Sequence, residues 1–155
     1  MRDPETAATR PVIDGVHHLK FAVSDPDRSL AFYETVFGAQ RMPAADHRDA
    51  DGRIYAYICD MPGFGTKLDL RQSDDHASSA RHFDPVTLNI ADRAALAEWI
   101  AHLDGLGVHH SGEIITALAF MLVIEDPDGR RIRLYTREKH GPELPGDKAN
   151  PWMQL

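Results

Sequence analysis

The amino-acid sequence predicts an α+β protein built from two copies of one unit, in which a strand leads into a helix and then into further strands. Three observations predict it. Residues 16–38 change from strand alternation to helical spacing, and residues 85–107 repeat that change. In both copies the helix is followed by two strand-like runs joined by a turn. A repeated supersecondary unit organises a whole fold, and 155 residues suffice for one domain or two small modules.

The first unit begins with a strand and continues into an amphipathic helix. Apolar side chains alternate along residues 18–23, which is the period of a strand with two different faces. They then recur at helical spacing along residues 26–37, so one helix face is apolar. Asp25 can accept hydrogen bonds from the first free amides of this helix, and Gly38 can end it. We therefore expect a capped helix directly after the first strand.

The rest of the first unit is predicted to contain a polar loop and two strands. Residues 39–53 are rich in polar and turn-forming residues, so we expect an exposed loop there. Strand-like residues 54–59 follow, then a turn at 61–65 and a closing strand at 67–72. Alternation in residues 54–59 predicts that Tyr55 and Tyr57 share one face of the sheet.

The second unit repeats this order. Residues 86–90 alternate as the first strand does, and Asp92 stands where Asp25 stands, ahead of a helix that ends at Gly107. The predicted strands 118–125 and 131–136 are joined by the turn at 126–129. Superposing the two units places His18 opposite Pro85 and Asp69 opposite Arg133.

The domain boundaries follow from the repeat and from composition. We expect a flexible N-terminal tail at 1–13, a first module at 14–72, a linker at 73–84, a second module at 85–137 and a C-terminal tail at 138–155. Prolines and glycines after Glu138 oppose regular strand pairing. Trp152 is too large an apolar side chain to leave in water without reason. It either packs on its own domain or covers a pocket or a second subunit.

Composition and charge exclude several classes of protein. The formal net charge of −7 and the lack of a basic stripe argue against nucleic-acid binding. No apolar run approaches the roughly 20 residues of a membrane span. The polar N-terminus is typical of a loose tail rather than a signal peptide, and a single cysteine allows no internal disulfide. We expect a cytoplasmic protein whose partner is a small molecule or another copy of the chain.

Three motifs carry a resemblance to a known family: His18 seven residues ahead of Asp25, Ser-Leu-Ala-Phe-Tyr at 29–33, and Asp-Pro-Asp-Gly at 126–129. With the repeated unit, the sequence resembles the vicinal oxygen chelate superfamily of glyoxalases, bleomycin resistance proteins and extradiol dioxygenases. The resemblance covers residues 14 to about 137. It implies two βαβββ modules that form a half-open barrel around a cavity, often in a homodimer.

The resemblance also implies where a metal would bind. In metal-dependent members the ligands come from the first and last strands of both modules, which here gives His18, Asp69, Pro85 and Arg133. Histidine and carboxylate suit zinc, nickel, iron or manganese. Proline has no side-chain donor atom, and arginine has no lone pair and repels a cation. His82 or Asp84 could supply a shifted third ligand, whereas His17 is expected to face the opposite side from His18.

The candidate ligand-binding residues lie on the predicted strands. They are His18, Lys20, Tyr57, Asp69, Asn89, Phe120 and Arg133. We expect His18, Asp69 and Arg133 to form a polar floor, with Asp69 and Arg133 either paired to each other or with Arg133 free to bind an anionic ligand. His18 and Asp69 are also the candidate catalytic acid–base residues and the remaining metal ligands.

Two functions remain open at this point. The first is a small-molecule-binding protein of this superfamily, without the usual catalytic metal, that sequesters a small, partly aromatic or anionic ligand in the barrel. The second is a glyoxalase-like lyase or isomerase, which would use a displaced divalent-metal site or acid–base chemistry by His18 and Asp69. One fold hosts many chemistries, so the fold alone does not choose between them.

Overall fold

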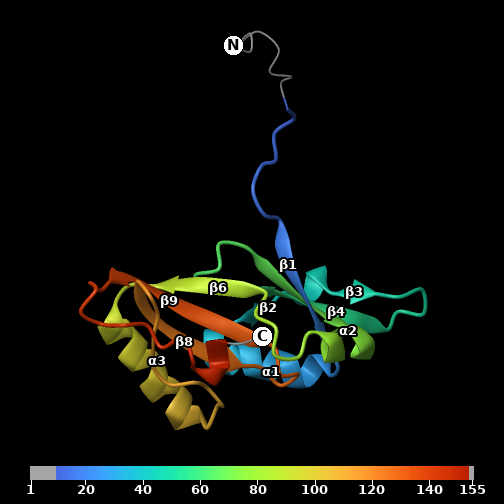
Figure 1. The fold of residues 1–155 in the computed structure, drawn as a ribbon. Helices are drawn as coiled ribbons and strands as arrows, with labels where there is room; N and C mark the ends of the chain where they lie inside the picture. The colour runs from blue at the N-terminus through green and yellow to red at the C-terminus, as the bar shows by residue number, and fades with distance from the viewer. Residues whose placement is uncertain (1–9, 154–155) are drawn as a thin grey trace.

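The computed structural model describes residues 10–153 and shows two βαβββ units side by side, with helices α1 and α3 below the sheets in the view of Figure 1. Of the predicted N-terminal tail, residues 1–9 lie outside the described residues. Residues 10–13 are exposed and have no regular structure. No helix of the described part of the chain is long and apolar enough to cross a bilayer.

The first unit forms one mixed sheet over one helix. Its elements are β1 (His18–Val23), α1 (Pro26–Phe37), β2 (Gln40–Arg41), the 3-10 helix η2 (Pro43–Ala45), β3 (His47–Arg48), β4 (Ile54–Asp60) and β5 (Lys67–Gln72). The strand order is β1-β5-β4-β2, with β3 also paired to β4. β1 runs parallel to β5, and β4 runs antiparallel to β5.

The second unit repeats this topology. A short helix α2 (Asp74–Ser79) precedes β6 (Val86–Ile90), α3 (Arg93–Leu106), β7 (Ile114–Ile115), β8 (Ala119–Glu125) and β9 (Arg131–Lys139), and a 3-10 helix η3 (Pro151–Met153) lies in the C-terminal segment. The strand order is β6-β9-β8-β7, and β6 runs parallel to β9. The predicted fold class of two βαβββ modules is therefore confirmed.

The predicted helix ends are confirmed by their hydrogen bonds. The Asp25 carboxylate accepts from the backbone N–H of Arg28 at 3.1 Å, and the Asp92 carboxylate accepts from that of Ala95 at 2.8 Å. Both helices end at a glycine in the left-handed region, with φ of 72° at Gly38 and 67° at Gly107. A side chain at these positions would strain the backbone.

Three segments carry more regular structure than the sequence predicts. The loop expected at 39–53 contains β2, η2 and β3, which are too short to show a period in the sequence. The linker expected at 73–84 contains α2, whose first turn holds Asp74 and Asp75, where negative charge favours a helix N-terminus. β9 also extends to Lys139, beyond the strand predicted at 131–136.

One hydrophobic core spans both units. Phe37 of α1 and Trp99 of α3 lie with ring centroids 5.6 Å apart, and Phe64 from the β4–β5 turn packs against Phe37 at 6.0 Å. The core cluster includes buried residues from β1, β5, β8 and β9 as well as from both helices. The two units are therefore packed on each other, although no strand of one sheet pairs with a strand of the other among the described residues.

A buried polar cluster fastens the β8–β9 turn to the first unit. Arg130 is 2% exposed, and its Nη1 donates to Asp126 Oδ2 at 2.8 Å. The Tyr33 hydroxyl donates to the same carboxylate oxygen at 2.8 Å, and Arg130 Nη2 donates to the Ala22 carbonyl. The guanidinium also lies 4.7 Å from the Phe21 ring centroid. We call Tyr33, Asp126 and Arg130 the inter-module clamp.

Burial raises the pKa of the Asp126 carboxyl, while the charge of Arg130 and the hydrogen bond from Tyr33 lower it. The clamp therefore holds an ion pair in a dry environment, where each charge depends on its partner.

The sheets themselves do not close into a barrel within one chain. Each sheet has one face against its helix, and the other face points away from the helices. These two outer faces carry the candidate sites.

Arg130→Ala tests the clamp, because it leaves the Asp126 carboxylate buried without its counter-charge. We expect the free energy of unfolding, measured by urea titration, to fall by about 3–5 kcal/mol. Arg28→Ala is the matched control. It removes an arginine that is 52% exposed and pairs with Asp128 in the same turn, so a loss within about 1 kcal/mol is expected. Equal losses in the two variants would contradict a special role for Arg130.

Candidate functional site

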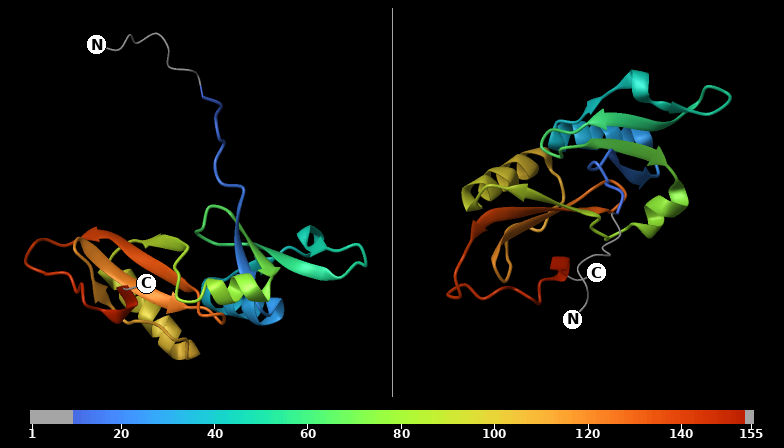
Figure 2. Two further views of the ribbon diagram at one scale, coloured as in Figure 1. Left: turned by 45° about the vertical axis from the view of Figure 1, so that its right-hand side comes forward. Right: turned by 90° about the horizontal axis from the view of Figure 1, so that it is seen from above.

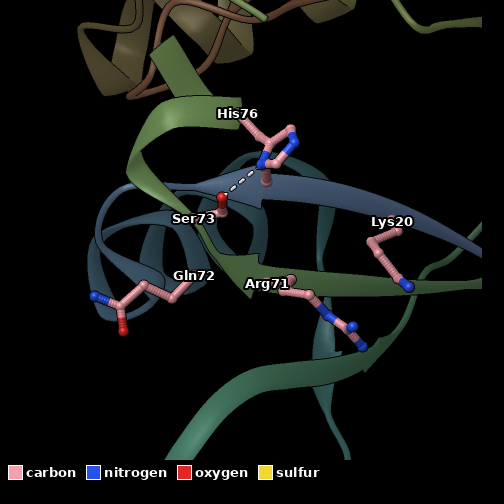
Figure 3. A pocket seen from close by; sticks show the side chains of 6 residues that line it. Lys20, Arg71, Gln72, Ser73 and His76 are labelled. Atoms are coloured by element: carbon pink, nitrogen blue, oxygen red, sulfur yellow. Dashed lines mark hydrogen bonds between the residues drawn. The ribbon is translucent and has the colours of Figure 1, made fainter. Parts of the chain in front are cut away.

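The outer face of the first sheet carries a cationic pocket. Its volume is about 460 Å³, and it is lined by Lys20, Ala22, Arg71, Gln72, Ser73 and His76. Parallel pairing sets Lys20 beside Asp69 and Ala22 beside Arg71, which brings the charged side chains to one face. Figure 3 shows Lys20 and Arg71 extending from neighbouring strands to the same side, whereas Gln72 points away from them. We call this the Lys20–Arg71 pocket.

Arg71 is held in place by two side chains. Its Nη2 donates to Asp69 Oδ2 at 2.9 Å and contacts His47 Nδ1 at 2.8 Å. Arginine only donates, so Nδ1 of His47 is the acceptor of this hydrogen bond. The guanidinium carbon also lies 5.3 Å from the centroid of the Tyr55 ring. The cationic group is thus fixed before any ligand arrives.

Asp69 lies beneath Arg71 and is fully buried. Its Oδ1 atom is buried and has no hydrogen-bond partner among the described residues. A buried polar atom without a partner is unusual in a folded protein. Among the pocket-lining residues that the structure describes there is no carboxylate, while Lys20 and Arg71 are both cationic side chains. The pocket is thus cationic in a chain of net charge −7.

His18 lies in a different, smaller pocket of about 160 Å³. That pocket is lined by His17, His18, Ala45, His47, Ile58 and Lys67. The Nδ1 atoms of His17 and His18 are 2.9 Å apart. The expectation that His17 faces the opposite side is wrong, because His17 precedes β1 and does not follow the strand alternation.

Tyr57 lies on the helix side of the first sheet. It pairs with Leu70, and its hydroxyl donates to Asp27 of α1 at 2.6 Å. This hydrogen bond raises the pKa of the Tyr57 hydroxyl. Tyr55, which was expected on the same face, instead contacts His47 and Arg71. The register of β4 against β3 shifts at His47 and Arg48, which breaks the regular alternation.

The candidates of the second unit lie apart from one another. Arg133 forms an ion pair with Asp84. Asn89 is exposed and lines a 190 Å³ pocket between the two units, together with Phe37 and Trp99. Phe120 is 4% exposed and belongs to the main core.

The predicted ion pair between Asp69 and Arg133 is therefore wrong. Each residue has another partner, Arg71 for Asp69 and Asp84 for Arg133. The two sheets do not close on each other, so positions that are equivalent in the repeat do not meet. The polar floor expected from His18, Asp69 and Arg133 does not form within one chain.

The residues at the implied metal positions do not fit a divalent cation. Pro85 has no donor atom, Arg133 is cationic, and the Asp69 carboxylate already binds Arg71. Of the two candidates for a shifted ligand, His82 and Asp84, the latter is paired with Arg133. Within residues 10–153, no three His, Cys, Asp or Glu side chains form a cluster that could hold a metal ion.

Sequence reasoning missed Arg71, His47 and His76. Arg71 follows Asp69 by two residues on β5, so strand alternation places it on the same face, and this signal was available in the sequence. His47 lies on the two-residue strand β3 and His76 on the short helix α2. Neither element is visible as a sequence period.

The outer face of the second sheet is covered by the C-terminal segment. Ile114, Met121 and Val123 form a buried apolar cluster, and Trp152 and Met153 pack against it. Figure 2 shows this segment and α3 on opposite sides of the sheet. The expectation that the tail packs back on its own domain is confirmed.

The covering segment begins at a histidine with two carbonyl partners. His140 Nδ1 lies 2.8 Å from the Gly141 carbonyl oxygen, and Nε2 lies 2.8 Å from that of Thr116. Carbonyl oxygens only accept, so both hydrogen bonds form only when both ring nitrogens carry protons. These hydrogen bonds raise the pKa of His140 above its usual value.

The fold and its two outer faces define a paired βαβββ protein. The model of the Glyoxalase/Bleomycin resistance protein/Dioxygenase superfamily matches residues 15–134, and the chain belongs to this superfamily. The resemblance to vicinal oxygen chelate proteins is thereby confirmed.

Individual relatives differ in activity. The chain is 24% identical over 132 residues to the "Putative ring-cleaving dioxygenase MhqA" of Bacillus subtilis strain 168, covering 82% of this chain but only 42% of that protein. It is 28% identical over 132 residues to the metallothiol transferase FosB of Bacillus licheniformis, covering 79% of this chain and 75% of FosB. The chain thus spans less than half the length of one relative and three quarters of the other.

Among solved structures, TnmS3, an antibiotic-binding protein from Streptomyces sp. CB03234, is similar with a TM-score of 0.65 and 25% identity. The match covers 83% of this chain and 100% of that chain. The superfamily relatives therefore include both a metallothiol transferase and an antibiotic-binding protein.

His140→Gln tests whether the protonated His140 ring anchors the covering segment, because a glutamine amide is neutral and carries both its donors on one nitrogen, so it cannot reproduce the two separate N–H groups of the imidazolium. A folded pKa above the unfolded one gives a stabilisation that is complete below the usual value of 6.5 and is lost as the pH rises through the folded pKa. We expect the stability difference between wild type and variant, from urea titrations, to be largest at about pH 5.5 and to shrink by about pH 8.5. A constant difference would contradict the protonated anchor.

Proposed function

We propose that the protein is a small-molecule-binding protein that holds a small, partly aromatic anion in the Lys20–Arg71 pocket and does so without the usual catalytic metal. One observation carries the proposal: Lys20 and the Arg71 guanidinium, which Asp69 and His47 hold in place, line a pocket that has no carboxylate on its described walls. An arginine fixed by Asp69 and His47 can form charge-assisted hydrogen bonds to a carboxylate, phosphonate or phosphate.

The side chains beside the Lys20–Arg71 pocket suit a ligand whose anionic group carries an aromatic substituent. Tyr55 stacks near Arg71, and the apolar side chains Ala56 and Ile58 share the outer face with Asp69 and Arg71 through strand pairing. The antibiotic-binding relative TnmS3 supports a binding role for this scaffold.

An enzyme remains the second candidate, because FosB is a metallothiol transferase. In a glyoxalase-like lyase or isomerase, His18 and Asp69 would act as acid and base. His18 lines the small pocket, whereas Asp69 is buried and paired with Arg71, so a shared acid–base role for the two has less support. We therefore favour binding over catalysis. We also propose that the chain forms a homodimer, as the resemblance implies, and that it is cytoplasmic, as expected from its composition.

Phenylphosphonate, a small aromatic anion, tests the Lys20–Arg71 pocket in an isothermal or NMR titration. We expect saturable binding with Kd near or below about 1 mM. Lys20→Gln should weaken it about tenfold, because a charge-assisted hydrogen bond is lost, while Lys139→Gln on the end of β9 should leave it unchanged. Arg71→Lys keeps the charge that Asp69 needs and should weaken binding through the lost bidentate geometry. Equal Kd values in wild type and Lys20→Gln would refute this site.

Elemental analysis of the untagged protein tests the metal-free part of the proposal. We expect much less than one equivalent of zinc, nickel, iron or manganese, and no saturable uptake on titration with each ion. His18→Ala should behave as wild type does. Near-stoichiometric metal that disappears in His18→Ala would overturn the proposal and direct the search to lyase or isomerase substrates.

A further inference from the structure

The Trp152 side chain lies in a cage on the second sheet. The guanidinium carbon of Arg131 lies 4.7 Å from the indole centroid, and the His109 ring lies edge-on at 4.9 Å. The floor is formed by Ile114, Met121 and Val123, each at most 1% exposed. We propose that this cage is a binding site for an electron-rich planar aromatic group, and that Trp152 is its resident occupant.

The cage chemistry selects a ring rather than an anion. Cationic guanidinium groups attract the face of an electron-rich ring, most strongly that of indole. The cationic charge of Arg131 is balanced locally, because Glu125 Oε2 lies 3.6 Å from its Nε and Glu125 Oε1 lies 3.9 Å from His109 Nδ1. A free carboxylate or phosphonate would therefore meet Glu125 as well as Arg131. A neutral aromatic group meets the ring-binding surface without that repulsion.

Two backbone contacts hold the C-terminal segment so that Trp152 reaches the cage. Asp147 N–H donates to the Ile115 carbonyl at 2.8 Å, which ties the segment to β7. At Gly146 the tail passes so close that a Cβ would lie 2.9 Å from the backbone nitrogen of Ala117. Only glycine permits this approach. The hydrogen bond of Asp147 and the close approach at Gly146 thus place Trp152 in the cage.

The occupant is nevertheless held lightly. Trp152 is only half-buried, and its backbone N–H donates to the side-chain oxygen of Asn150 within the tail, at 3.0 Å. η3 spans only Pro151–Met153, and residues 141–150 form neither helix nor strand. The tail is therefore attached at this end by the indole and by Met153, and a ligand with a similar ring can compete for the indole contacts. Such a tail acts as a tethered competitor, whose effective concentration sets the ligand concentration needed.

This site is separate from the Lys20–Arg71 pocket. The cage lies on β7, β8 and β9 with the His109 loop, and the pocket lies on β1, β5 and α2. The inference does not rest on the proposed function, and either can fail alone.

N-acetyltryptophanamide, a neutral indole probe, tests the cage in the full-length Trp152→Ala variant. With ¹³C-methyl methionine labelling, the Met121 signal should move when the indole is removed. The probe should shift it back with a saturable curve and half-saturation in the millimolar range, about 1–10 mM. In wild type the same probe should need at least about tenfold more, because Trp152 competes. N-acetylalaninamide should have no effect.

Two variants distinguish specific binding of the probe in the cage from nonspecific binding to exposed apolar surface. Arg131→Ala combined with Trp152→Ala should weaken probe binding about three- to fivefold, through the lost cation–ring attraction. Phe83→Ala removes an aromatic side chain that is 52% exposed elsewhere, and it should respond to the probe as wild type does. A Trp152→Ala signal that does not saturate, or that matches Phe83→Ala, would overturn the proposal.

A second measurement keeps the test decisive if Trp152→Ala does not fold. In Trp99→Phe the only remaining indole is Trp152. Adding Arg131→Ala should raise the acrylamide quenching constant of its fluorescence about twofold or more, because the cage no longer shields the ring. Unchanged quenching would refute the cage.

Discussion

The fold depends on the buried ion pair between Asp126 and Arg130. It joins the β8–β9 turn of the second unit to Tyr33 and the Ala22 carbonyl of the first, 93 and 108 residues away along the chain. Because the pair is dry, its two charges tolerate little displacement. It therefore fixes how the two repeats sit on each other, and the apolar contact between Phe37 and Trp99 fills the space between the helices.

The two units are joined through a turn and their helices, not through the outer faces of their sheets. The side chains on those outer faces can therefore differ between the two units. The strand registers align Lys20, Asp69 and Arg71 of the first sheet with Thr87, Arg133 and Tyr135 of the second. The first set forms a fixed cationic pocket. In the second, Arg133 turns to Asp84, and Tyr135 joins the apolar surface beneath the tail. One repeated backbone thus carries two faces with different side-chain chemistry.

The fold was predictable because its signals are local. Capping by Asp25 and Asp92 and alternation along β1 and β6 depend on neighbouring residues, so the repeat can be recognised in the sequence. The site was predictable only in part. Lys20 and Asp69 were placed by alternation, but the partners of Asp69 and Arg133 depend on how the sheets pack, and the repeat symmetry suggested the wrong pair. His47 and His76 lie on elements too short to leave a pattern.

Asp69 decides which chemistry the first face supports. A fully buried carboxylate needs a counter-charge, since an unpaired one costs several kcal/mol. Arg71 supplies that charge from two positions along the same strand, and His47 orients it. A divalent cation at Asp69 would have to displace Arg71 and leave a guanidinium beside the ion, where the two charges repel. The same pairing leaves one oxygen of Asp69 unused and directs a fixed cation to the pocket. A single ion pair thus disfavours metal binding at Asp69 and holds the Arg71 guanidinium in the place that the proposed anion site requires.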